Sequence, residues 1–553
     1  MQNAALEGVR LYPGDQKYRF YYGSSLAFEG RIQEAIRELD AIHEHRDLCL
    51  GALLALIYAH RQCKTLDREA ITQLESSLRD QRKSATEASL YFAGLFLIFV
   101  RKYEKARDYI ERMYKMSPTL REGQIAKGWL ELHFATNGGG VTDGNDERDV
   151  LGAAAYFETA ASLNDPEGLL GKAEVYAKAG QHGRSMEVLS KAIVTYHNFV
   201  PAYIEKAKQQ VALKDWDEAL DTVYRTANLD RHCIDTQRLA IIHCLVWEAK
   251  EELAVSKLTD LLSSLELREP KNLRLCLETG RLFSRLADQS REVLNMTVTF
   301  VERAALLDSN NPEVHCEFGH HYILLDKYAD AQRYFKNATK LDESNLNGLI
   351  GLLYTNILED SSNAEALEQL EALEEFNQAD GLTNELLYLC ALSGERRGKS
   401  DEQVIKYLDQ ISTKLLNSIA DLPLGLEFYL NVDPEMTCNV VRLYLESGPA
   451  EPLAAGQPLP PVLKYARDIL QPIVNSCPSL KEPLYLMSCI KYMSGDSSGS
   501  LSLLEKCLEA NQSFSHGHML KAKLLASQGH LQTATQCLEM ALSHNFQVKI
   551  SRN

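Results

Sequence analysis

The chain has 553 residues, of which 45% are hydrophobic and 24% are charged, and this composition is typical of a folded protein. Its formal net charge of −17 argues against a general attraction to nucleic acids or anionic membrane surfaces, because both require cationic patches. Its twelve cysteines form no C-x-x-C pair, so we expect apolar packing residues and neither a disulfide framework nor a zinc site.

Residues 312–345, PEVHCEFGHHYILLDKYADAQRYFKNATKLDESN, show most clearly a spacing that recurs along the chain. Counted from Pro312 as position 1, small residues stand at positions 8, 20 and 27, and large aromatic ones stand at 7, 11, 17 and 24. The small residues let two antiparallel helices approach closely, while the large ones fill the space between helix pairs. This spacing is the tetratricopeptide pattern, a helix–turn–helix unit of 34 residues.

The same spacing is present from the start of the chain. Residues 1–15 match the second helix of a pair whose first helix is missing, and a complete unit follows from Gln16. Asp67 is an acceptable N-cap for a later second helix, and Pro118 is expected to end another. Because the first hairpin is incomplete and the chain also ends within a hairpin, we expect an internal segment or shortened form of a longer array.

The array is interrupted once and then continues in phase. The glycine- and aspartate-rich stretch 136–149 predicts a loop inserted into the unit from Arg121. A solvated insertion explains it better than a calcium site, because the EF-hand spacing is absent. Units from Pro166 and Val200 follow without slippage, and the register weakens after about Ile234.

After the unit that begins at Pro312, the repeats loosen and then stop. Residues 422–461 depart from the pattern except for a plausible helix at 436–446, and five prolines between Pro449 and Pro461 exclude a helix interior there. Regular units return at Lys481, and a further unit is expected beyond His544. We therefore predict an N-terminal tetratricopeptide array at 1–421, an irregular joint at 422–480 and truncated C-terminal units at 481–553.

The fold class that follows is all-α. We expect a right-handed superhelical solenoid in which each helix pair covers the apolar face of its neighbour. No apolar run reaches the roughly 20 residues that a membrane span needs, and the N-terminus lacks the pattern of a secretory signal.

No constellation of residues for catalysis stands out in the sequence. The phosphate-binding G-x-x-x-x-G-K-[ST], the dinucleotide-binding G-x-G-x-x-G and the zinc-binding H-E-x-x-H are all absent. His320 and His321 are adjacent on a helix and therefore point in different directions, so surface or packing roles explain them better than a metal site. We expect no catalytic residues, no metal and no cofactor.

Binding in such an array is expected on the concave surface, where positions 2, 5, 9 and 12 of the first helices face the groove. A clamp for a terminal carboxylate would need lysine at position 5 and asparagine at position 9, but position 5 is mostly apolar here and position 9 has no asparagine. The groove should therefore prefer an apolar helix or extended segment of another protein. The candidate groove residues are Phe20, Tyr91, Ile125, Leu170, Ile204, Leu277, Ile350, Tyr485 and Met519. For each of them, packing between neighbouring first helices is an equally good alternative.

Several segments go beyond the generic repeat. They are ALIYAH at 55–60, DREAI at 67–71, YFAGLFL at 91–97, KARDYIERM at 105–113, LPLGLEFY at 422–429 and GQPL at 456–459. On these segments the chain resembles the tetratricopeptide repeat protein 21 family, the large peripheral subunit of intraflagellar transport complex A. The resemblance covers essentially the whole chain and includes the irregular joint. EPLYLM and SHNFQV favour the A-type paralogue over the B-type.

The resemblance implies a non-catalytic scaffold for retrograde transport from ciliary tip to base and for the entry of membrane proteins into the cilium. The implied partners are other complex A subunits and ciliary cargo or adaptor proteins, with no nucleic acid and no membrane insertion. The implied location is the cytoplasm and the cilium, at the axoneme and ciliary base with the cytoskeleton. Two alternatives remain: a tetratricopeptide adaptor or co-chaperone outside the cilium, and the helical-repeat regulatory region of an enzyme.

Overall fold

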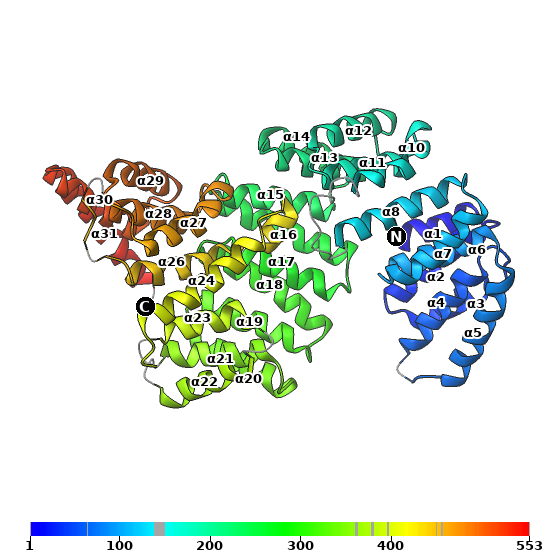
Figure 1. The fold of residues 1–553 in the computed structure, drawn as a ribbon, viewed down its shortest axis with the longest axis horizontal. Helices are drawn as coiled ribbons and strands as arrows, with labels where there is room; N and C mark the ends of the chain where they lie inside the picture. Colours follow the sequence, from blue (N-terminus) through cyan, green and yellow to red (C-terminus); the bar gives the residue numbers. More distant parts are fainter. Residues whose placement is uncertain are drawn as a thin grey trace. The chain divides into compact units, whose positions relative to one another are not determined.

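The computed structural model describes residues 2–551 except 64, 138–149, 360–362, 378–380, 395–396, 450 and 455–456. The described part is helical and contains no β-strand. It forms two compact units, residues 1–210 and 211–553, in which consecutive helices pair and stack (Figure 1). The predicted all-α tetratricopeptide architecture is confirmed. The division predicted at 421/422 and 480/481 stays a prediction.

The first unit consists of helical hairpins. Its elements are α1 (Gln2–Leu11), α2 (Gln16–Phe28), α3 (Ile32–Asp40), α4 (Cys49–Arg61), α5 (Arg68–Gln81), the 3₁₀ turn η1 (Arg82–Ser84), α6 (Glu87–Phe99), α7 (Tyr103–Met116), α8 (Arg121–Asn137), α10 (Ala154–Ser162), α11 (Pro166–Lys178), α12 (His182–Thr195) and α13 (Val200–Ala212), which crosses the boundary. Asp67 caps α5 as predicted, because its carboxylate accepts the amide of Ala70 at 3.0 Å. The predicted loop at 136–149 begins later than expected, since Thr136 and Asn137 still belong to α8, and its remainder lies outside the described residues.

The second unit contains the remaining elements. They are α14 (Trp216–Leu229), α15 (Ile234–Val246), α16 (Glu251–Arg268), α17 (Leu273–Arg285), α18 (Arg291–Leu307), α19 (Pro312–Leu324), α20 (Tyr328–Leu341), α21 (Leu346–Glu359), α22 (Ala364–Asn377), α23 (Asn384–Leu392), α24 (Asp401–Asn417), α25 (Leu426–Asn431), α26 (Pro434–Glu446), α27 (Pro461–Ser476), α28 (Lys481–Met493), α29 (Ser497–Ala510), α30 (Ser515–Ser527) and α31 (Leu531–Ser551). The last helix runs unbroken past His544, so the turn into a further unit that we expected there is not observed.

The spacing of glycine and large residues has a direct steric basis. Phe335 of α20 is fully buried between Gly319 of its own hairpin and Gly351 of the next one. A Cβ atom added to either glycine would lie 2.4 Å or 2.3 Å from the Phe335 ring, a separation that real carbon atoms do not adopt. Phe157 of the first unit meets Gly128 and Gly171 in the same way. Both units therefore use an aromatic ring that is packed between two glycines.

The predicted irregular joint is part of the core of the second unit. The helix expected at 436–446 is present as α26, and Pro461 begins α27 at the position where a helix accepts proline. Tyr429 of α25 is completely buried, and its hydroxyl donates to the Ser476 carbonyl oxygen at 2.8 Å. The indole N–H of Trp247, at the end of α15, donates to the same hydroxyl at 3.5 Å. The chain thus returns to helices that lie about 180 residues earlier in the sequence, and the second unit closes on itself.

The cysteines fit the packing role that we predicted. All twelve are free thiols, and each is buried or half-buried. Burial raises the pKa of the Cys477 thiol to about 12. Such a thiol is protonated at neutral pH and is a poor nucleophile or metal ligand.

Candidate functional site

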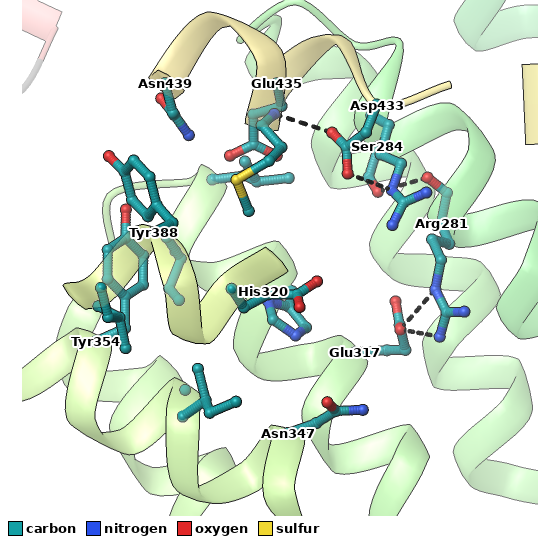
Figure 2. Close-up of a pocket in the computed structure, with 18 of the residues that line it drawn as sticks. Arg281, Ser284, Glu317, His320, Asn347, Tyr354, Tyr388, Asp433, Glu435 and Asn439 are labelled. Carbon is teal, nitrogen blue, oxygen red and sulfur yellow. Dashed lines mark hydrogen bonds and ion pairs between the residues drawn. The ribbon is translucent and has the colours of Figure 1, made fainter. Parts of the chain in front are cut away.

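The second unit contains an open cavity of about 290 Å³. Its walls come from α17, α19, α21 and α23, which are the first helices of successive hairpins, and from α26 of the joint (Figure 2). The first helices lie side by side in chain order, and α26 packs against α23. The cavity therefore lies along the first helices of these hairpins, and α26 of the joint forms its remaining wall.

One wall of the cavity carries an ion-pair network between α17 and α19. The guanidinium of Arg281 donates through Nε to Glu317 at 2.8 Å and contacts the same carboxylate through Nη2. Nη2 also lies 3.4 Å from Glu313. Burial is the largest single influence on Glu317 and would raise its pKa, but the charge and hydrogen bonds of Arg281, together with His320 and His321, outweigh burial and lower that pKa. Arg281 and Glu317 thus remain charged and satisfy each other.

A second ion pair joins α17 to the start of α26. Arg285 Nε lies 3.2 Å from the carboxylate of Asp433. The other oxygen of Asp433 accepts the amide of Met436 at 2.9 Å, so Asp433 is also the N-cap of α26, and Pro434 follows at the first helical position. One carboxylate therefore both begins α26 and fixes it to α17.

Glu435 and two tyrosines supply the rest of the polar lining. Glu435 is half-buried and forms no ion pair with any residue that the structure describes. Burial, and then the neighbouring Asp433, raise the pKa of Glu435 to about 7. Tyr354 of α21 and Tyr388 of α23 lie across the cavity from Arg281 (Figure 2), and their rings meet edge to face with centroids 6.2 Å apart.

The charges that line the cavity are unbalanced. Its carboxylates are Glu313, Glu317, Glu385, Asp433 and Glu435, whereas its permanent cations are Arg281 and Arg285. Both arginines already bind carboxylates. In addition, no group of three or more His, Cys, Asp or Glu side chains in the described part of the chain is arranged to hold a metal ion. The arrangement is suited to binding a positively charged group.

The predicted groove residues are dispersed along both units. Phe20, Ile125, Leu277 and Ile350 are buried; Tyr91, Leu170, Ile204 and Tyr485 are half-buried; and Met519 is 41% exposed. Only Ile350 among them lines the cavity. The burial of these four side chains agrees with the alternative role, packing between neighbouring helices.

The cavity also contains residues that the prediction omitted although the repeat numbering could have found them. Arg281, His320 and Tyr354 occupy position 9 of three successive units, and Glu313 and Glu385 occupy position 2. These positions were expected to face the groove. The candidate groove residues, however, were all taken from position 5, which is mostly apolar. Residues of α26 lie outside any repeat unit, so no signal in the sequence placed them here.

Two family models match the chain. The "Tetratricopeptide repeat protein 21 N-terminal ARM repeat" covers residues 1–220, and the "Tetratricopeptide repeat protein 21 second ARM domain" covers residues 256–529. The chain belongs to the tetratricopeptide repeat protein 21 family. Within this family it is similar to tetratricopeptide repeat protein 21B of Mus musculus (35% identity over 546 residues) and of Homo sapiens (33% over 545 residues).

Members of both paralogue types are similar to the chain. Tetratricopeptide repeat protein 21A of Mus musculus is 32% identical over 547 residues, so the identities do not separate the A-type from the B-type. Each of these alignments covers 99% of this chain and 41% of the relative. A solved structure of the Cut9–Hcn1 hetero-tetramer of the APC/C matches with a TM-score of 0.36 and 11% identity, covering 98% of this chain and 96% of that one. None of the described helices combines the length and apolar character that a membrane crossing requires.

Proposed function

We propose that this member of the tetratricopeptide repeat protein 21 family is a non-catalytic protein-interaction scaffold of intraflagellar transport complex A. In this role it supports retrograde ciliary transport and the trafficking of proteins into the cilium. Its partners are other complex A subunits and ciliary cargo or adaptor proteins, and it acts in the cytoplasm, at the ciliary base and along the axoneme. The observation that carries the proposal is the similarity to family members along 99% of the chain.

The roles of the charged side chains in the second unit favour a scaffold function over an enzymatic one. The charged groups of Arg281, Glu317 and Asp433 are engaged in ion pairs and a helix cap, which position helices. Within the described residues, the joint that departs from the repeat is built into the core of the second unit and is not a separate domain. A stack of helical hairpins offers long surfaces for partner proteins.

Affinity purification from ciliated cells tests this proposal. The tagged chain is expressed at low level, and the recovered proteins are quantified by mass spectrometry. We expect enrichment of complex A subunits relative to the tag alone. Glu368→Gln, on the exposed surface of α22, serves as the matched control and should recover the same proteins. Failure of a folded, monodisperse chain to enrich any complex A subunit would remove the ciliary assignment.

A further inference from the structure

We propose that the cavity bounded by α17, α19, α21, α23 and α26 binds the lysine or arginine side chain of an extended segment of a partner protein. This inference rests on the proposed role as a protein-binding scaffold, but it does not depend on the ciliary assignment. It also differs from the apolar ligand that the position-5 residues suggested.

The charged side chains that line the cavity favour a cationic ligand over an anionic one. Arg281 and Arg285 are held by Glu317 and Asp433, so an anionic ligand would have to break an existing ion pair. Glu435 and Glu385, by contrast, line the cavity without an ion pair to any residue in the described part of the chain. A carboxylate in such a partly buried place gains most from a charged hydrogen-bond donor.

The shape and the aromatic wall select a single long side chain. A helix is about 10 Å across with its side chains, and one or two of its turns would exceed a cavity of about 290 Å³. The Tyr354 and Tyr388 rings face the space beneath Glu435 (Figure 2). An ammonium or guanidinium group placed there would meet the negative faces of these rings as well as the carboxylates.

The lining residues differ in solvent exposure, and this difference shows where the cavity opens. The side chain of Glu313 is 58% exposed, whereas the side chain of Glu317, one helical turn further along α19, is 8% exposed. A basic side chain can therefore enter past Glu313 while the backbone of its peptide stays outside. This arrangement favours a side chain carried by a protein segment over a free small cation.

Protonation of Glu435 should control the affinity. The charged groups nearest to it are Asp433, which caps α26, Arg442 of α26 and Arg285 of α17, and the side chain of Asn439 hydrogen-bonds to it. The phenol groups of Tyr354 and Tyr388 face it from α21 and α23. The imidazole of His320 and the carboxylate of Glu385 line the same cavity from α19 and α23. The pKa of Glu435 is raised to about 7, and only the ionised carboxylate attracts a cation. Affinity should therefore rise as the pH increases from 6 to 8, over which the guanidinium of an arginine peptide stays charged.

Met436 provides a reporter inside the cavity. The purified chain is labelled with ¹³C at the methionine methyl groups and titrated with acetyl-Gly-Arg-Gly-amide and, separately, with acetyl-Gly-Gln-Gly-amide. We expect a saturable shift of the Met436 signal with the arginine peptide only, and stronger binding at pH 8 than at pH 6. Replacing both Glu435 and Glu385 by Gln should weaken binding by about tenfold or more, since two charged contacts are lost.

Controls separate binding from folding. Glu368→Gln removes an exposed carboxylate of the same unit and should bind the peptide as the unchanged chain does. Glu435→Gln should weaken binding without lowering the melting temperature, because it removes a buried charge. This pair of results cannot arise from a merely destabilised fold.

Three results would overturn the inference. These are no saturable Met436 shift at pH 8, equal shifts with the glutamine peptide, or methylguanidinium binding as tightly as the arginine peptide, which would assign the cavity to small free cations. The titration uses purified protein, so its failure leaves complex A membership intact. Failure of the affinity purification would likewise leave the cavity proposal standing.

Discussion

The carboxylate of Asp288 accepts the backbone amide of Lys481 at 2.5 Å and that of Glu482 at 3.2 Å. Asp288 lies in the turn between α17 and α18, where its φ of 48° is positive, whereas the two amides begin α28. An acidic residue at a helix N-terminus satisfies unpaired amides and interacts favourably with the helix dipole. Here the acid comes from 193 residues earlier in the chain, so it is a latch of the second unit as well as a cap.

Loss of this latch should destabilise the second unit. Asp288→Ala leaves two amides of α28 without their acceptor, and we expect a loss of about 1–2 kcal/mol in the free energy of unfolding. Asp288→Asn retains an acceptor oxygen and should lose less. Thermal unfolding of both variants measures the difference, with Asp496→Ala, a local cap of α29, as the comparison. Equal stability of Asp288→Ala and the unchanged chain would contradict the assignment as a latch.

The pH dependence of stability follows from two carboxyl groups. Burial, despite the favourable charge of Lys481, raises the pKa of Asp288 to about 7, and that of Glu435 is also about 7. Between the unfolded pKa near 4 and these values, the folded state binds more protons than the unfolded state. The contribution of both groups to stability is therefore greatest at low pH and is lost as the pH rises to about 7.

Denaturant unfolding at pH values between 5 and 8 tests this dependence. In Glu435→Gln, we expect the midpoint to fall less between pH 5 and pH 7 than in the unchanged chain. Glu368→Gln should leave the dependence unaltered, because its carboxylate is exposed. A midpoint that changes with pH identically in all three proteins would exclude Glu435 as a contributor.

The hydroxyl of Tyr429 should contribute measurably to closure of the second unit. Tyr429→Phe keeps the ring but leaves the Ser476 carbonyl without its donor, which should cost about 1–3 kcal/mol. The ring also lies near Trp216 and Trp247, so the tryptophan emission reports on the same place. We expect lower stability with a nearly unchanged emission spectrum for Tyr429→Phe, and a changed spectrum for Tyr429→Leu. Unchanged stability of Tyr429→Phe would show that the hydroxyl is dispensable.

The sequence predicts the hairpins well because their signals are local. The 34-residue spacing places glycine against a large residue within one hairpin, and Asp67 caps the helix that follows it by accepting an amide three residues further on. The closure of the second unit depends instead on pairs such as Asp288 with Lys481, whose residues have no fixed spacing. The lining of the cavity is predictable only in part. The repeat indicates its residues at positions 2 and 9, but Glu435 and Asp433 come from a segment without any repeat register.

Because Phe335 packs between two glycines, we expect a larger side chain at either glycine to destabilise the protein. Gly351→Ala places a methyl group 2.3 Å from the ring, so the ring or the helix must shift, and we expect a loss of about 1–3 kcal/mol in the free energy of unfolding. Gly183→Ala is the matched control in α12, since its added Cβ atom meets nothing within 4 Å. That control should stabilise the chain by up to about 1 kcal/mol through helix propensity.

A second substitution tests whether the Phe335 ring causes the loss of stability in Gly351→Ala. Phe335→Leu alone removes buried surface and should destabilise the unit. Combined with Gly351→Ala, it makes room for the new methyl group, so the double variant should lose less stability than the sum of the two single losses. Additive losses in thermal unfolding would mean that Gly351 is required for a reason other than the Phe335 ring, and the steric basis of the repeat spacing would fail at this position.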